Sequence, residues 1–135
     1  MDVEIRDPSS LLPLTPAVLH ILLALADGER HGYAIMREVE GRTRGEMRLG
    51  PGTLYGSIKR MLAEGLIEES EERPDPELDD HRRRYYRITD FGRWVAGAEV
   101  ERLAGLVSTA REKAPISASC PASPPLGNRL RSRSA

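Results

Sequence analysis

The stretch LGPGTLYGSIKRMLAEGLI, residues 49–67, decides how this chain of 135 residues folds. After the break at Gly50-Pro51-Gly52, apolar side chains recur at the i, i+4, i+7 and i+8 spacing of one helix face. These side chains are Leu54, Ile58, Met61 and Leu62. Gly65 is placed to end the helix in the left-handed conformation, which a glycine adopts without strain. The stretch therefore predicts an amphipathic helix with one buried face and one open face.

The open face of this helix carries polar, basic and small residues. Thr53 lies at the helix start, where a hydroxyl can bond a phosphate, and Gly56 lets a backbone approach closely. Lys59 and Arg60 can reach phosphates or guanine edges. Tyr55 lies at the edge of the apolar stripe, so we expect its ring to pack on the core and its hydroxyl to stay available. From these residues alone, a DNA-docking face and an ordinary solvated helix surface remain equally good interpretations.

Two shorter helices are predicted before this stretch. The first begins at Thr15-Pro16, an N-cap followed by a proline in the first turn, and ends at Asp27-Gly28. The second runs from His31-Gly32 to Gly41. Between residues 42 and 50 apolar and polar residues alternate, which predicts a short strand.

Two strands and a long helix are predicted after it. Leu66-Ile67 and Tyr85–Ile88 are rich in β-forming residues, and the long polar segment between them makes a wing. Thr89 caps a final helix that has Asp90 in its first turn and runs to about Lys113. The fold class is therefore mainly α (α+β), a winged helix-turn-helix, in which the third helix enters the DNA major groove.

Basic charge is concentrated on the returning strand of the wing, although the net charge of the chain is −1. Residues 68–80 contain eight acidic residues and one arginine, whereas residues 82–87 contain four arginines. Arg82, Arg83 and Arg84 alternate between the two faces of the strand, and with Arg87 we expect them to straddle a phosphate ridge or the minor groove. The alternative is a charged wing edge that only prevents aggregation.

Three motifs closely resemble those of PadR-family transcriptional regulators. They are the 49–67 stretch, HGYAI at residues 31–35, and RRRYYRITDFG at residues 82–92. They occur in the family's order, and the resemblance covers about residues 14 to 112. It implies a DNA-binding regulator, most often a repressor, that works as a homodimer on a pseudo-palindromic operator.

The chain is expected to have four parts. Residues 1–13 are a flexible N-terminal arm, and residues 14–88 form the winged helix DNA-binding domain. Residues 89–113 form a C-terminal dimerisation helix. Residues 114–135 are rich in Ser, Pro and Ala without apolar periodicity, which predicts a disordered tail.

The final helix shows two apolar faces. Phe91, Val95 and Ala98 lie on one face, and a second face is rotated from it by roughly 120° at 100° per residue. We expect the first to pack on its own domain and the second to contact a partner subunit. The alternative is a helix that folds back on a monomer. The predicted dimerisation residues are Val100, Leu103, Leu106, Val107 and Ala110.

The resemblance also raises an effector site. Many members of the family respond to a small apolar or phenolic molecule, and Trp94 near the dimer interface is the candidate contact in this chain. The alternative is a tryptophan packed in the core.

No metal, cofactor or catalytic residue is predicted. The acidic segment 75–81 lacks the ligand order of a calcium loop, and no serine has a nucleophile setting, so we expect no enzyme. No apolar run is long enough to span a membrane and no signal sequence precedes the domain, which predicts a cytoplasmic protein. The competing hypothesis is a winged domain used for protein–protein assembly, in which the basic strand binds an acidic partner.

Overall fold

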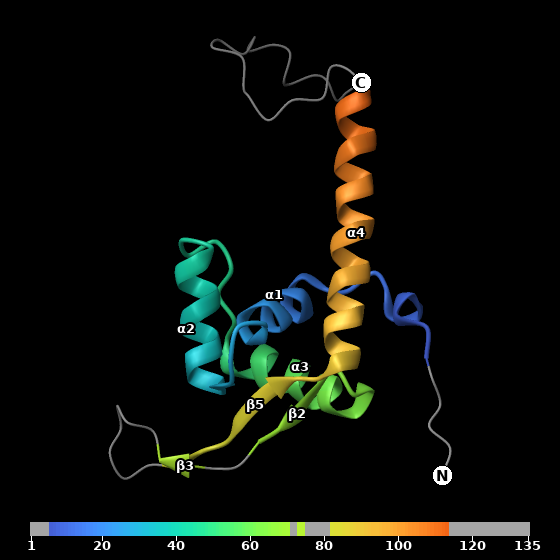
Figure 1. Ribbon diagram of the computed structural model, residues 1–135. Coiled ribbons are helices and arrows are strands. Elements are labelled where there is room, and N and C mark those ends of the chain that lie inside the picture. The colour runs from blue at the N-terminus through green and yellow to red at the C-terminus, as the bar shows by residue number, and fades with distance from the viewer. Residues whose placement is uncertain (1–5, 71–72, 75–81, 114–135) are drawn as a thin grey trace, which may run out of the picture. The chain divides into compact units, whose positions relative to one another are not determined.

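The computed structural model describes residues 6–70, 73–74 and 82–113 (Figure 1). The chain divides into two compact units, residues 1–101 and residues 102–135, and each is described by itself. The elements are, in chain order, η1 Pro8–Leu11, α1 Pro16–Leu25, β1 Arg30–His31, α2 Gly32–Arg42, α3 Pro51–Glu64, β2 Ile67–Glu69, β3 Arg73–Pro74, β4 Arg82–Arg83, β5 Tyr85–Ile88 and α4 Asp90–Glu112.

The helices that the sequence predicts are present, and their ends follow local signals. The Thr15 hydroxyl oxygen accepts a hydrogen bond of 3.2 Å from the Val18 amide, and Pro16 occupies the first turn of α1. Helix α3 ends at Gly65, which has φ 78° and ψ 16°, as expected for a left-handed glycine cap. Local side-chain and backbone chemistry thus sets where these helices begin and end.

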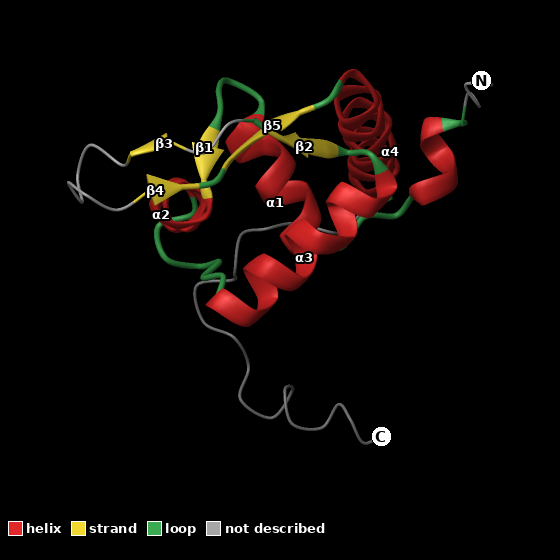
Figure 2. Cartoon of the chain, turned by 90° about the horizontal axis from the view of Figure 1, so that it is seen from below, coloured by secondary structure: helices red, strands yellow, loops and turns green. Residues whose placement is uncertain are grey.

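A three-stranded antiparallel sheet in the order β1-β5-β2 completes the winged fold. Ile67 of β2 pairs with Ile88 of β5, and His31 of β1 pairs with Tyr85. Figure 2 shows α1 and α3 on one face of these strands. The short strands β3 and β4 form a separate antiparallel pair farther along the wing. The mainly helical winged fold predicted from the sequence is confirmed.

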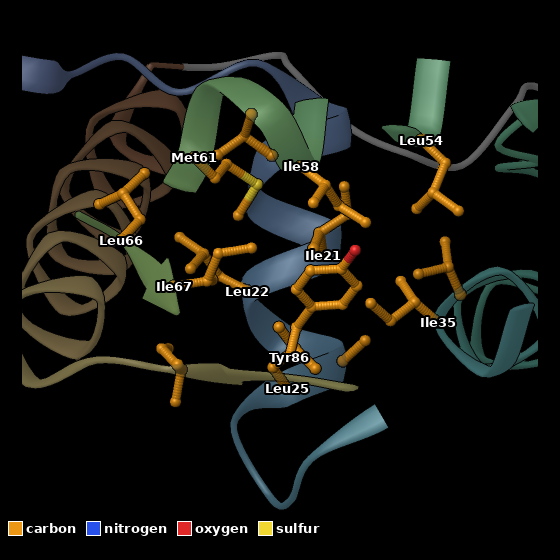
Figure 3. Close-up of a cluster of buried hydrophobic side chains, with 14 of the residues drawn as sticks. Ile21, Leu22, Leu25, Ile35, Leu54, Ile58, Met61, Leu66, Ile67 and Tyr86 are labelled. Carbon is orange, nitrogen blue, oxygen red and sulfur yellow. The ribbon is translucent and has the colours of Figure 1, made fainter. Parts of the chain in front are cut away.

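The core lies between the first three helices and the sheet, as Figure 3 shows. Side chains from α1, α3 and β5 meet there, and Leu54 and Met61 of α3 are fully buried. Each such side chain stabilises the fold by about 1.5–3 kcal/mol relative to leaving it exposed. The core therefore fixes the inner face of α3 and leaves its outer face open. The labelled core residues are Ile21, Leu22, Leu25, Ile35, Leu54, Ile58, Met61, Leu66, Ile67 and Tyr86.

Two sequence predictions about local structure are wrong. Residues 42–50 form no strand, because Arg44 (φ 55°) and Gly45 (φ 81°) turn the chain in the left-handed region directly after α2. The Thr43 hydroxyl closes this turn by accepting a 3.0 Å bond from the Met47 amide. The arm predicted over residues 1–13 contains the 3₁₀ helix η1, and Leu11 and Leu12 pack against the core.

Thr89 joins the end of α3, the start of β2 and the start of α4. Its hydroxyl lies 2.6 Å from the Gly65 carbonyl oxygen and 3.0 Å from that of Leu66, and it accepts a 2.9 Å bond from the Gly92 amide. A Cβ atom at Gly92 would overlap the Leu66 carbonyl oxygen. The predicted Thr89 cap is confirmed, and the close packing of α4 requires glycine at position 92.

The buried face of α4 in the first unit differs from the predicted one. Gly92, Val95 and Glu99 are buried, whereas Phe91 and Ala98 are only half-buried. Val95 and Phe91 of the predicted face do pack on the core, and the prediction missed Gly92 and Glu99 because it considered apolar side chains alone. Glu99 is 2% exposed and accepts a 3.2 Å hydrogen bond from the Leu14 amide.

Candidate nucleic-acid interface

The outer face of α3 brings together five of the residues predicted to bind DNA. All five are exposed, while the neighbouring Leu54 and Ile58 are buried. An open hollow of about 640 Å³ follows this face, from the first turn of the helix to its last. Its lining residues are Gly52, Thr53, Gly56, Ser57, Lys59, Arg60 and Ala63. A Cβ atom added at Gly56 would have no neighbouring atom within 4 Å, so the backbone there is open to a ligand.

The two cations of α3 are exposed and differ from arginines that pair with carboxylates, such as Arg30 and Arg42. Lys59 and Arg60 are exposed and have no ion-pair partner among the described residues. By contrast, Arg42 pairs with Glu38 at 3.4 Å. Unpaired cations on an exposed helix face give a local positive potential that the net charge of −1 does not reveal.

The first turn of α3 leaves backbone donors available. Its N-cap Gly50 makes no side-chain cap bond, and Pro51 has no amide hydrogen. The Leu54 amide bonds the Gly50 carbonyl at 2.9 Å, which leaves the amides of Gly52 and Thr53 at the positive end of the helix dipole. Such a helix start can bind a phosphate oxygen.

Tyr55 packs against the first residue of α2. Its side chain is 45% exposed, and its ring lies across Gly32, where a Cβ atom would come within 2.8 Å of the Tyr55 Cζ. The sequence prediction of a ring at the edge of the core fits this position. The contact itself was missed, because Gly32 and Tyr55 belong to separate motifs and no local spacing connects them.

His31, for which no role was predicted from the sequence, caps α2. Its Nδ1 accepts a 3.1 Å hydrogen bond from the Ala34 amide, and its ring meets Tyr85 edge-on at 5.2 Å. Tyr86 points the other way and is 6% exposed. Burial, followed by the charge of Glu69, raises the pKa of Tyr86, so its hydroxyl stays protonated at neutral pH.

The wing arginines are partly engaged by the acidic strand β2. Arg84 pairs with Glu69 at 3.3 Å, and Arg87 pairs with Glu68 at 2.8 Å. Hydrogen bonding to Glu68 is the main cause of a raised pKa of Arg87. Because these pairs are exposed and screened by solvent, a phosphate can replace the carboxylate at small cost.

The side chains of Arg82 and Arg83 lie outside what the structure describes, although their backbone forms β4. The acidic segment 75–81 also lies outside the described residues.

Helix α4 carries exposed apolar side chains. Trp94 is 60% exposed, so the alternative of a packed core tryptophan is wrong. Of the residues predicted for dimerisation, Val100, Leu106 and Val107 are exposed, and Leu103 and Ala110 are half-buried.

Within the described ranges, no cluster of three His, Cys, Asp or Glu side chains could hold a metal ion. No helix in that part of the chain is both long and apolar enough to cross a membrane.

Two curated proteins are similar to this chain. The chain is 38% identical over 98 residues to an uncharacterized 37.1 kDa protein in transposon TN4556 of Streptomyces fradiae, covering 73% of this chain and 26% of that protein. It is 43% identical over 75 residues to the transcriptional regulator Rv3488 of Mycobacterium tuberculosis, covering 56% of this chain and 64% of that protein. The chain thus spans less than two thirds of the length of either relative.

The fold and the family agree. The crystal structure of a PadR family transcription regulator from Clostridium difficile R20291 superposes with a TM-score of 0.60 at 23% identity, covering 73% of this chain and 97% of that one. The profile of the transcriptional regulator PadR-like family matches residues 21–98, which is more than half of the chain. The chain therefore belongs to the PadR-like family, a family of transcriptional regulators and not of enzymes.

Proposed function

We propose that this chain is a sequence-specific DNA-binding transcriptional repressor whose α3 enters the major groove. The observation that carries the proposal is the outer face of α3, where unpaired Lys59 and Arg60 flank an open hollow. Thr53 and the free amides of the first turn would bind a phosphate, and Gly56 would allow close approach. Lys59 and Arg60 would reach base edges or phosphates.

The returning wing strand would contact the backbone beside the groove. Arg82, Arg83 and Arg84 supply charge there, and Arg84 would exchange Glu69 for a phosphate. Tyr55 would add a hydroxyl from the edge of α3. Contacts of this kind contribute affinity and a steep salt dependence more than sequence choice.

The repressor would bind a pseudo-palindromic operator as a homodimer in the cytoplasm. Val100, Leu106 and Val107 offer exposed apolar surface, and covering such surface favours association. A symmetric pair would present two copies of α3 to successive major grooves. A small apolar or phenolic effector would contact the exposed ring of Trp94.

Selection from a random DNA pool, followed by mobility-shift titration of the selected duplex, tests the proposal. We expect Lys59→Glu with Arg60→Glu to weaken binding at least about 30-fold, because each base or phosphate contact is worth about 1–3 kcal/mol. Arg93→Glu, an exposed charge reversal on α4, is the matched control and should change binding little. Failure to enrich any duplex at low salt, or unchanged binding by the double variant, would overturn the proposal and leave protein–protein assembly as the better hypothesis.

A further inference from the structure

The segment of residues 6–14 packs against two helices, although the sequence predicts a flexible arm there. At its start, the Arg6 guanidinium donates a hydrogen bond to the carbonyl oxygen of Glu64, the last residue of α3. The same guanidinium lies over the Phe91 ring, 4.3 Å from its centre, in the first turn of α4. Arg6 therefore joins the end of α3 to the beginning of α4.

The other end of the segment is also held. The Leu14 amide donates a 3.2 Å hydrogen bond to the carboxylate of Glu99, and that side chain is 2% exposed. Between the two ends, Leu11 and Leu12 pack half-buried against the core. Residues 6–14 thus form a strap. Both of its ends contact α4, and the end at Arg6 also contacts the C-terminus of α3.

The end of α3 is built to receive Arg6. The last carbonyls of a helix lack helical partners and carry partial negative charge, which a guanidinium there satisfies and neutralises. A Cβ atom at Gly65 would lie 3.2 Å from a guanidinium nitrogen of Arg6. Glycine at position 65 therefore provides both the left-handed cap and the space for Arg6.

From these contacts we propose that Arg6 is a positioning residue for DNA recognition. By tying the C-terminal end of α3 to α4, Arg6 sets the angle at which Lys59 and Arg60 face the groove. The inference rests on the proposed function above, in which α3 reads DNA. Arg6 acts through α3 and does not itself contact DNA.

Amide hydrogen exchange tests this positioning without DNA. The amides of Gly65 and Leu66 close the last turn of α3, with bonds of 3.2 and 2.9 Å. In Arg6→Ala we expect them to exchange about 3- to 10-fold faster, from the loss of a helix-end cation and its ring contact. Arg6→Lys should restore most of the protection, and Arg93→Ala, which removes one exposed charge from α4, should leave it unchanged. Unchanged exchange in Arg6→Ala overturns the inference whatever the chain does with DNA.

Salt-dependent titration of a duplex selected by the wild-type chain separates positioning from direct contact. Arg6→Ala should bind about 3- to 10-fold more weakly, with the slope of log K against log salt unchanged, and Arg6→Lys should recover most of the affinity. A slope smaller by about 1 would mean a lost phosphate contact and would overturn the positioning role. Unchanged affinity would overturn it too. If no duplex is enriched, the proposed function fails, and hydrogen exchange alone decides whether Arg6 holds α3.

Discussion

The close approach of α4 to β2 at Gly92 makes a stability prediction that the geometry defines well. In Gly92→Ala the added Cβ would overlap the Leu66 carbonyl oxygen and lie 2.9 Å from Ile88 Cγ1. The Leu66 carbonyl belongs to the backbone and lies within hydrogen-bonding distance of the Thr89 amide (3.1 Å) and hydroxyl (3.0 Å), so it cannot rotate away. The start of α4 must therefore move outward, and both Thr89 bonds must lengthen.

The expected loss follows from three terms. Overpacking a close contact costs about 1–3 kcal/mol, and weakening two hydrogen bonds costs about 0.5–1.5 kcal/mol each when they are lost entirely. The helix propensity of alanine offsets about 1 kcal/mol relative to glycine. We expect Gly92→Ala to lower the free energy of unfolding by about 2–3 kcal/mol on these figures.

Urea denaturation followed by circular dichroism measures this difference. Gly97→Ala is the matched control, because Gly97 is exposed on the same helix and a Cβ there meets nothing within 4 Å. We expect this control to stabilise the chain by about 0.5–1 kcal/mol. Several protein concentrations are needed, since self-association adds to apparent stability. A Gly92→Ala chain as stable as Gly97→Ala would refute the reasoning from the close approach.

Three further predictions concern the DNA interface, the contact of α1 with α2, and self-association. Gly32→Ala places a Cβ 2.8 Å from Tyr55 Cζ, so the exposed ring must swing aside and DNA affinity should fall about 3-fold in a mobility-shift titration; an equal loss in a Tyr55→Ala background would contradict the contact. Burial, followed by the charge of Arg42, lowers the pKa of His20, so stability is complete above its usual 6.5 and is lost as pH falls through the lower folded value. His20→Gln should therefore show a smaller drop in urea midpoint from about pH 7 to about pH 5, and an identical drop would refute this assignment. Leu106→Lys should weaken self-association at least about tenfold in sedimentation equilibrium, whereas an unchanged mass would count against α4 as the dimer interface.

The sequence predicted those parts of the fold that depend on neighbouring residues. The Thr15 and Thr89 caps and the Gly65 cap act within a single helical turn, so their signals are local. The apolar spacing of α3 likewise separates its buried and open faces. The exposure of the candidate site residues on α3 could be predicted because these same positions define its outer face.

Tertiary contacts account for what the sequence did not predict. Strand β1 is only two residues long, and it exists because Arg30 and His31 pair with a strand more than fifty residues later. Arg6 has no periodic pattern around it, and its order comes from contacts with α3 and α4. Glu99 was not predicted to be buried, because a glutamate breaks the apolar pattern. Its carboxylate is buried because the Leu14 amide, which is distant in sequence, supplies a hydrogen bond.

The contact between Gly32 and Tyr55 also restricts how the two motifs can change in evolution. A side chain at position 32 would meet the Tyr55 ring, whereas glycine is not required there once that ring is replaced by a smaller group. Substitution at position 32 therefore costs DNA affinity while Tyr55 is present and is free of that cost once position 55 has changed. Among related sequences the two positions should co-vary, with the change at position 55 the earlier one in reconstructed ancestors.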